Sequence, residues 1–192
     1  MATQSIMLGL GTEAPPFALP DTGGRKLTRD DAAGPAGLLV LFISNHCPYV
    51  KHARDELVRV AADYAGRGLG TVAIGSNDVE RYPEDGPEEM AAVADGHHFG
   101  FPYLWDESQE VARAYQAACT PDLFLFDAGL RLFYRGQLDD SRPSNGRPVT
   151  GADLRGAIDA LLAGQPAPEP QRPSVGCGIK WKPGNQPGLK LV

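Results

Sequence analysis

The sequence predicts an α/β domain in which helices flank a central mixed sheet. Apolar runs of strand length alternate with segments of helical periodicity in the first part of the chain. Further along, two apolar runs lie close together and are separated only by a turn. Strands that alternate with helices form parallel pairs, whereas a hairpin is antiparallel. The sheet is therefore expected to be parallel at one side and mixed at the other.

The first half of the chain predicts a strand, a helix and a second strand. The run GLLVLFIS at 37–44 suits a central strand that is covered on both faces. A helix is expected from Pro48, because proline lacks the N–H that a first helical turn leaves unpaired. Apolar residues recur at three- and four-residue spacing up to Tyr64, and Gly66 closes the segment. The run TVAIG at 71–75 predicts the second buried strand.

The second half predicts three helices and a hairpin. Proline and two glutamates open the first helix at the positive end of its dipole. Ala128-Gly129 is a turn signal that joins two strands. The expected elements are helices at 87–98, 108–117 and 151–162 and strands at 122–127 and 130–135.

We expect one compact domain over residues 1–163 and a tail over residues 164–192. A chain of 192 residues has an ordinary length for one domain. Four prolines in the segment GQPAPEPQRP, at 164–173, favour an extended linker. Beyond it the tail carries Cys177, Ile179 and Trp181, which another part of the protein should bury.

The charge and hydropathy patterns exclude several kinds of partner. Eighteen basic and 24 acidic residues give a net charge of −6, and no basic block could neutralise a run of phosphates. No apolar run approaches the roughly 20 residues of a membrane span, and the N-terminus lacks the pattern of a signal peptide. We therefore expect a cytoplasmic protein without a nucleic-acid or membrane partner.

The cysteines point to reactivity at one position. Three cysteines in a reducing compartment do not suggest a structural disulfide framework, so transient redox chemistry or plain packing remain. Cys47 lies in NHCPYVKH, 45–52, where the predicted strand ends and the helix begins. The helix N-terminus supplies about half a positive charge, which favours a thiolate. Most free cysteines are inert small hydrophobes, but this position predicts a reactive thiolate.

The same segments resemble the thioredoxin superfamily, and within it the redoxin group of peroxiredoxin-like proteins. The resemblance lies in GTEAPPFALPD at 11–21, in the apolar strand that leads into NHCP, and in CTPD at 119–122, and it covers most of the chain. It implies a thioredoxin-like fold, with a central mixed sheet flanked by helices and a C-terminal extension. It also implies a cis peptide bond between Thr120 and Pro121, with Pro121 beside Cys47.

The tail carries a second match. The segment CGIKWKPG, 177–184, is similar to the pattern around the resolving cysteine of two-cysteine peroxiredoxins. The resemblance implies that Cys177 resolves an oxidised Cys47. The proline-rich arm would suit a homodimer in which each tail reaches its neighbour, or it could fold back on its own domain. Cys119, two residues before Pro121, could lie close to Cys47 or point into the sheet.

The chain also departs from both family patterns. Thioredoxins carry a second cysteine where this chain has Val50, so Cys47 must pair with Cys119, Cys177, a second subunit or an external thiol. Peroxiredoxins place a hydroxyl three residues before the cysteine, and Ser44 supplies it, but their proline position is Val40. Their peroxide-binding arginine has no counterpart in the CTPD segment. Candidates that could reach in from elsewhere are Arg113, Arg131, Arg135 and Arg142.

Three functional hypotheses follow. In the first, Cys47 reduces a peroxide and becomes a sulfenic acid, Cys177 or Cys119 condenses with it, and a thioredoxin-like reductant restores the thiols. This cycle requires no metal or organic cofactor. In the second, the protein is a disulfide reductase or isomerase whose substrate chain adds a strand beside Pro121. In the third, the fold is a binding or sensor module without catalysis.

Overall fold

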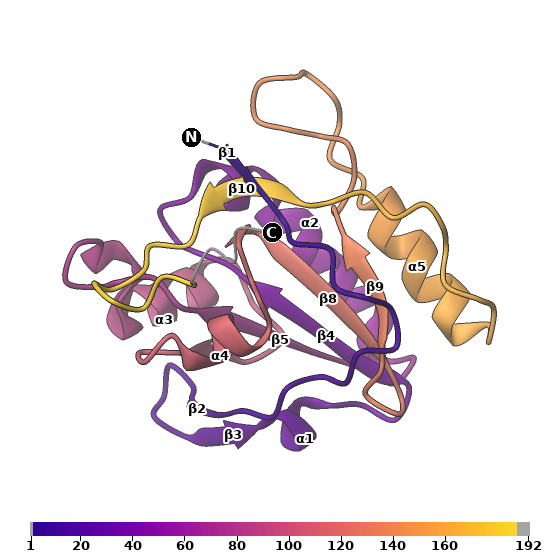
Figure 1. Cartoon of the computed structure of the whole chain (residues 1–192), viewed down its shortest axis with the longest axis horizontal. Coiled ribbons are helices and arrows are strands. Elements are labelled where there is room, and N and C mark those ends of the chain that lie inside the picture. The colour runs from indigo at the N-terminus through magenta and orange to yellow at the C-terminus, as the bar shows by residue number, and fades with distance from the viewer. Residues whose placement is uncertain (1, 188–192) are drawn as a thin grey trace.

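The structure is a computed structural model that describes residues 2–187. Its central sheet is formed by β4 (Gly37–Phe42), β5 (Leu69–Gly75), β6 (Tyr103–Trp105), β8 (Asp122–Asp127) and β9 (Leu132–Gly136) (Figure 1). β4 pairs antiparallel with β8 and β8 with β9, whereas β5 and β6 are parallel. The Ile43 amide donates to the Ile74 carbonyl at 3.1 Å and joins β4 to β5. The predicted mixed α/β sheet is therefore confirmed.

Helices cover both faces of this sheet. They are α1 (Arg29–Ala32), α2 (Pro48–Ala65), α3 (Pro87–Gly96), α4 (Glu110–Ala114) and α5 (Ala152–Leu162), with a 3₁₀ turn η1 at Pro83–Asp85. Because side chains alternate along a strand, β4 supplies both cores. Leu39 and Leu41 pack in the cluster that includes α2, α3 and α5. Leu38 and Val40 pack in the cluster that includes α4 and the segment before β2.

Helix α2 begins where the sequence predicts it. Pro48 occupies the first turn, Cys47 is the N-cap residue and Gly66 is the C-cap residue. The buried residues of α2 recur at three- and four-residue spacing: they are Val50, Ala53, Glu56, Leu57, Val60, Ala61 and Tyr64. The strand–helix junction that carries Cys47 is therefore fixed by local sequence.

Several elements are shorter or begin later than the periodicity indicates, and for two of them the local cause is visible. The helix expected at 108–117 is reduced to α4, because Gln109 has a left-handed conformation (φ 64°) and α4 begins only after it. In the hairpin, the Asp127 carboxylate accepts hydrogen bonds from the amides of Gly129 and Arg131, both at 2.9 Å. This turn extends to Arg131, so β9 begins later than expected.

The two ends of the chain meet in a second, small sheet. Strand β10 (Val175–Gly178) lies between β1 (Ala2–Gln4) and β7 (Cys119–Thr120) and is antiparallel to both (Figure 1). A short β2–β3 pair (Ala18–Pro20 and Lys26–Thr28) lies elsewhere on the domain. After β10, Ile179 is buried and Trp181 packs against the apolar cluster that includes α4 and the segment before β2. The tail thus folds back over its own domain, which buries its apolar residues.

The close contact between β10 and β7 depends on a glycine. A Cβ atom on Gly176 would clash with the carbonyl oxygen of Thr120. Glycine at this position lets the two backbones approach.

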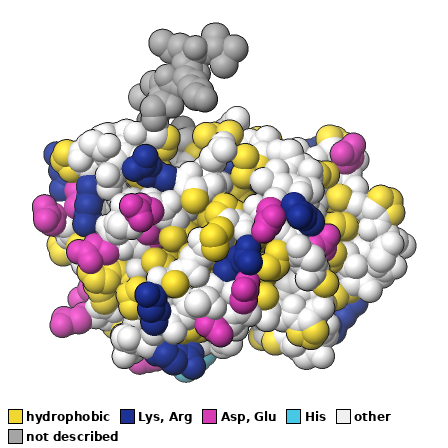
Figure 2. Space-filling view, turned by 60° about the horizontal axis from the view of Figure 1, so that its bottom comes forward, with side chains coloured by type: hydrophobic (Ala, Val, Ile, Leu, Met, Phe, Trp, Pro, Cys, Tyr) yellow, Lys and Arg dark blue, Asp and Glu magenta, His cyan; other side chains and the backbone are white. Residues whose placement is uncertain are grey.

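Charged side chains of both signs are interspersed among apolar ones on the face shown in Figure 2. Within residues 2–187, no helix combines the length and the apolar character that a membrane crossing needs.

Candidate active site

Cys47 lies at the N-terminus of α2 and is fully buried, with an exposed fraction of 0%. Its thiol donates a hydrogen bond to the Thr120 carbonyl oxygen at 3.1 Å. The Thr120–Pro121 peptide bond is cis, as the family resemblance implied. The structure therefore brings Cys47 together with the CTPD segment, and a helix N-terminus favours a thiolate at that place.

Cys177 is the neighbour of Cys47. In the pairing of β10 with β7, Cys177 lies directly opposite Thr120, whose carbonyl accepts the Cys47 thiol. Burial raises the pKa of Cys177 to about 11, and the hydrogen bond with Cys47 and its charge contribute in the same direction. Lys180 has the opposite, weaker influence on this pKa. The two thiols are therefore in contact range within one chain, without a second subunit.

Cys119 occupies a different environment. Its thiol points toward the carbonyl oxygens of Pro121, at 3.6 Å, and Ser174, at 4.0 Å. Burial, followed by the Asp122 carboxylate, raises the pKa of Cys119 strongly. Burial raises the pKa of Cys119 further than that of Cys177, so Cys119 forms the nucleophilic thiolate less readily of the two. Of the two cysteines that could resolve Cys47, Cys177 is the better placed.

One of the candidate arginines, Arg135, pairs with the buried Asp122. Arg135 and Asp122 are both fully buried, and their closest charged atoms, Nη2 and Oδ2, are 3.8 Å apart. The Ser5 hydroxyl donates to the same carboxylate. This ion pair explains why the interior accommodates an arginine side chain.

The other candidate arginines lie elsewhere. Arg113 is exposed, Arg131 pairs with Glu13 at 3.5 Å, and Arg142 lines a pocket beside Pro121. Within residues 2–187, none of the four donates a hydrogen bond to the Cys47 sulfur. The site therefore differs from the peroxiredoxin pattern at the arginine position.

Asp85 organises the loop before Cys47, and the sequence analysis did not single it out. Its buried carboxylate accepts hydrogen bonds from the Ser44 hydroxyl at 3.2 Å, the Asn45 amide at 2.6 Å and His46 Nδ1 at 2.7 Å. The Asn77 side chain donates to it as well, at 2.7 Å. The Ser44 hydroxyl is thus engaged by Asp85. An aspartate in the loop 82–85 gives no local signal for this role, because most of its partners come from the distant loop that follows β4.

The tail is anchored on the same side of the site. His46 stacks on Tyr82 with ring centroids 4.9 Å apart, and the Lys180 ammonium lies 5.8 Å from the Tyr82 centroid. The Lys180 amide donates to the Asn77 side chain at 2.8 Å. These contacts fix the chain immediately after β10, and so they help to hold Cys177 over Cys47.

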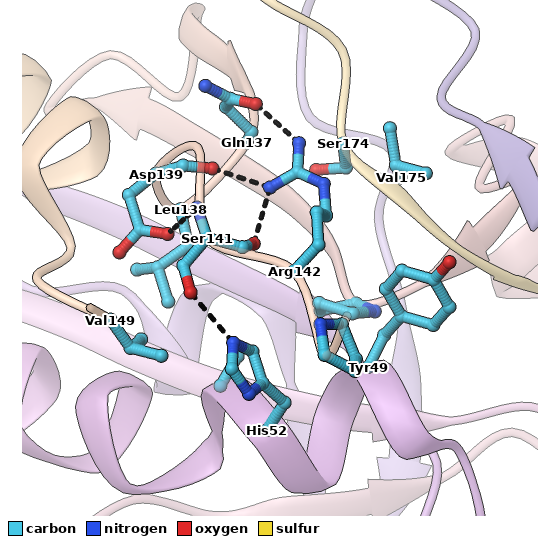
Figure 3. Close-up of a pocket in the computed structure, with 13 residues that line it drawn as sticks. Tyr49, His52, Gln137, Leu138, Asp139, Ser141, Arg142, Val149, Ser174 and Val175 are labelled. Carbon is cyan, nitrogen blue, oxygen red and sulfur yellow. Dashed lines mark hydrogen bonds between the residues drawn. The ribbon is translucent and has the colours of Figure 1, made fainter. Parts of the chain in front are cut away.

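A small pocket borders the site next to Pro121 (Figure 3). Tyr49 and His52 reach it from α2, and Arg142 reaches it from the loop after β9. The His52 Nε2 atom forms a 2.8 Å hydrogen bond with the Ser141 hydroxyl. No group of three or more potential metal ligands occurs within the described residues 2–187.

Comparisons with known proteins agree with this architecture. The model of the AhpC/TSA family matches residues 10–134, a region that contains Cys47 and Pro121 but not Cys177. "Putative peroxiredoxin Rv2521" of Mycobacterium tuberculosis is 27% identical over 115 residues, which cover 60% of this chain and 68% of that protein.

Two solved structures are also similar. An uncharacterized conserved protein from Geobacillus kaustophilus has a TM-score of 0.94 and 56% identity, covering 95% of this chain and 97% of that one. The thioredoxin domain of a thiol-disulfide oxidoreductase from Bacteroides vulgatus has a TM-score of 0.63 and 15% identity, covering 81% of this chain and 99% of that one. This last likeness shows the thioredoxin-like fold.

The family match spans most of the chain and includes the strand–helix junction with its cysteine. Together with the neighbouring Cys47 and Cys177 thiols, it supports a thiol redox function. The chain therefore belongs to the AhpC/TSA family, a redoxin family of the thioredoxin superfamily.

Proposed function

We propose that the protein is a thiol peroxidase in which Cys47 reduces a small hydroperoxide and Cys177 of the same chain resolves the oxidised cysteine. The observation that carries the proposal is the register of β10, which sets Cys177 opposite the residue that accepts the Cys47 thiol. The family match and the distant relative named as a putative peroxiredoxin support the choice of a peroxide as the substrate.

The chemistry has two steps. The Cys47 thiolate attacks one peroxide oxygen, the O–O bond breaks, and the second oxygen leaves as water or an alcohol after it takes up a proton. The product is a sulfenic acid at Cys47. The Cys177 sulfur then attacks this sulfur, hydroxide leaves and is protonated to water, and a Cys47–Cys177 disulfide forms. An external thiol, such as the thioredoxin-like reductant expected from the sequence, returns both cysteines to thiols.

The position of β10 favours a small substrate over a protein disulfide. A substrate chain of the second hypothesis would add a strand to β7 beside Pro121. In this structure β10 already pairs with both residues of β7, and Cys47 beneath it has an exposed fraction of 0%. A small peroxide requires a smaller movement of the tail to reach this sulfur than an extended polypeptide, which would have to displace β10 from β7.

The experiment is rapid-mixing oxidation of the reduced protein by hydrogen peroxide, followed by intact mass and cysteine mapping. We expect Cys47 to react far faster than free cysteine and to be found bridged to Cys177 within a single chain. In Cys177→Ser, a dimedone adduct should accumulate at Cys47, while Cys119→Ser should behave as the unmodified protein. Oxidation of Cys47 at the rate of free cysteine would rule out the peroxidase.

A further inference from the structure

The pocket beside Pro121 carries a charge that the proposed peroxidase cycle does not use. Its cavity volume is about 30 Å³, which is space for about two water molecules. Such a volume suits an end group of a small molecule, not a peptide. Its walls combine apolar and polar residues with two oppositely charged side chains, those of Arg142 and Asp139.

The Arg142 side chain is held in place but is not neutralised. Its Nη1 atom donates to the carbonyl oxygens of Asp139 and Ser141, both at 2.7 Å, and its Nη2 atom donates to the Gln137 side chain at 2.5 Å (Figure 3). All three acceptors are uncharged. Within residues 2–187, no carboxylate oxygen lies within 4.0 Å of its guanidinium nitrogens. A guanidinium has five N–H groups, so donors remain for a ligand.

The acidic residue of the lining, Asp139, has its carboxylate occupied by the loop backbone. The Asp139 carboxylate accepts backbone hydrogen bonds from Ser141 at 2.9 Å and from Thr150 and Gly151 at 2.7 Å. These bonds turn the carboxylate toward the loop backbone. Of the two charged side chains that line the pocket, Arg142 keeps free N–H groups, and a carboxylate that enters the pocket can pair with this guanidinium.

Strand geometry connects this pocket to the cysteine pair. Val175 lines the pocket, and Cys177 is two residues further along β10. Residues i and i+2 of a strand point to the same face, about 6.6 Å apart. A molecule anchored at Arg142 by one end would therefore extend along this face toward the Cys177 sulfur.

The disulfide chemistry selects Cys177 as the sulfur that a reductant attacks. Cys177 is partly exposed, whereas Cys47 is fully buried. Attack on Cys177 expels Cys47, whose thiolate the N-terminus of α2 stabilises. Attack on Cys47 would expel Cys177 instead, and it would require the thiol to reach a sulfur that is fully buried.

We propose that the pocket formed by Tyr49, His52, Pro121, Arg142 and Val175 binds the carboxylate of a low-molecular-weight thiol, which reduces the Cys47–Cys177 disulfide. The inference rests on the proposed function, because it assigns the reductant of that same disulfide. The thiolate attacks the Cys177 sulfur, the S–S bond breaks and Cys47 leaves as a thiolate. A second thiol molecule then attacks the mixed disulfide, releases Cys177 and departs as the oxidised small-molecule disulfide.

The test compares two thiols of equal chain length on the oxidised protein: 6-mercaptohexanoate, which has a carboxylate, and 6-mercaptohexanol, which has none. For each thiol the second-order rate constant is measured, and the value for the carboxylate is divided by the value for the alcohol. This ratio is then divided by the same ratio measured on bis(2-hydroxyethyl) disulfide. The resulting normalised ratio is free of differences in the intrinsic reactivity of the two thiols. We expect a preference of about tenfold for the carboxylate, since a charge-assisted hydrogen bond contributes about 1.5 kcal/mol or more. A normalised ratio of one overturns the proposal.

Variants assign the preference to one residue. In Arg142→Gln the ratio should fall to about one, while the matched Arg147→Gln, an exposed arginine of the same loop, should keep the tenfold preference. Arg142→Lys keeps the charge and should retain part of the preference, which guards against a folding defect in Arg142→Gln. A preference that persists in Arg142→Gln excludes this pocket.

A separate measurement distinguishes failure of the pocket from failure of the peroxidase. Hexanoate is titrated into the Cys47→Ser protein, and chemical-shift changes are followed at Tyr49 and Arg142. We expect saturable shifts that Arg142→Gln abolishes. If the Cys47–Cys177 disulfide never forms, the proposed function fails, and the hexanoate titration still decides whether the pocket binds carboxylates. Absence of saturable shifts overturns the pocket.

Discussion

Cys177 lies directly opposite Thr120 in the antiparallel pair of β10 and β7, and the Thr120 carbonyl accepts the thiol of Cys47. One backbone position therefore holds both partners of the proposed disulfide. The strand that carries Cys177 also covers Cys47. The proposed resolution of an oxidised Cys47 by Cys177, and the proposed preference for small substrates, both depend on this single pairing.

A substitution at Gly176 tests the pairing of β10 with β7 directly. In Gly176→Val, the added side chain clashes with the Thr120 carbonyl and should push β10 away from β7. We expect disulfide formation after peroxide treatment to slow by at least about tenfold, because 1.4 kcal/mol of lost positioning has that effect, while Cys47 still forms a sulfenic acid. The matched control is Gly156→Ala in α5, where a Cβ atom meets nothing within 4 Å. Dimedone trapping with rapid quenching measures both steps, and equal disulfide rates in the two variants would contradict the assigned register.

Asp85 is predicted to support the Cys47 loop. Asp85→Ala leaves the Ser44 hydroxyl, the Asn45 amide and the His46 ring without their buried acceptor. The free energy of unfolding should fall by about 1–3 kcal/mol, the usual loss for unsatisfied buried donors. Urea unfolding measures this loss, and peroxide oxidation of Cys47 should also slow. The neighbouring exposed Glu84→Ala is the control, and equal destabilisation by both changes would argue against the network.

Ser44 is expected to matter less than its position in the peroxiredoxin pattern implies. Its hydroxyl donates to Asp85, and that contact orients the loop before Cys47. Ser44→Ala should therefore slow peroxide oxidation less than Asp85→Ala does. A larger loss in Ser44→Ala, measured by rapid-mixing kinetics, would indicate that the hydroxyl contacts the peroxide.

The resolving step should accelerate with rising pH. Burial and the neighbouring Cys47 raise the pKa of Cys177 to about 11, so this thiol is almost fully protonated at neutral pH. Its thiolate fraction grows about tenfold per pH unit below the pKa, and only the thiolate is the nucleophile. The rate of disulfide formation from the sulfenic acid should rise from pH 7 to pH 9 without a plateau. A plateau below pH 9 would mean that Cys177 titrates near the ordinary thiol range.

The buried ion pair should be costly to break from one side. Asp122→Ala leaves the Arg135 guanidinium buried without its carboxylate. Loss of one partner of a buried pair lowers the free energy of unfolding by about 3–5 kcal/mol. The double change Asp122→Ala with Arg135→Met removes both charges and should recover much of that loss. Urea midpoints of the single and double variants measure the coupling, and simple additivity would show that the pair is not coupled.

The sequence by itself determined those helices and strands that depend on a pattern of neighbouring residues. The strand at 122–127 and the start of α2 at Pro48 occur as predicted, because a continuous apolar run and a proline after the N-cap act over a few neighbouring residues. The same local logic placed Cys47 at a strand–helix junction. Family resemblance, not local pattern, indicated Cys177 and the CTPD segment, and it implied that Pro121 lies beside Cys47.

Only the tertiary structure decided which residues meet at the site. Asp85 accepts hydrogen bonds from Ser44 and His46, which lie about forty residues earlier in the sequence. Cys177 lies opposite Thr120 because β10, which follows the proline-rich segment, pairs with β7. Such contacts depend on how distant segments pack against each other. The hydrophobic periodicity of one sequence does not reveal that packing. The local sequence therefore indicates Cys47 as the proposed nucleophile, whereas long-range strand pairing brings its proposed resolving partner, Cys177, to the site.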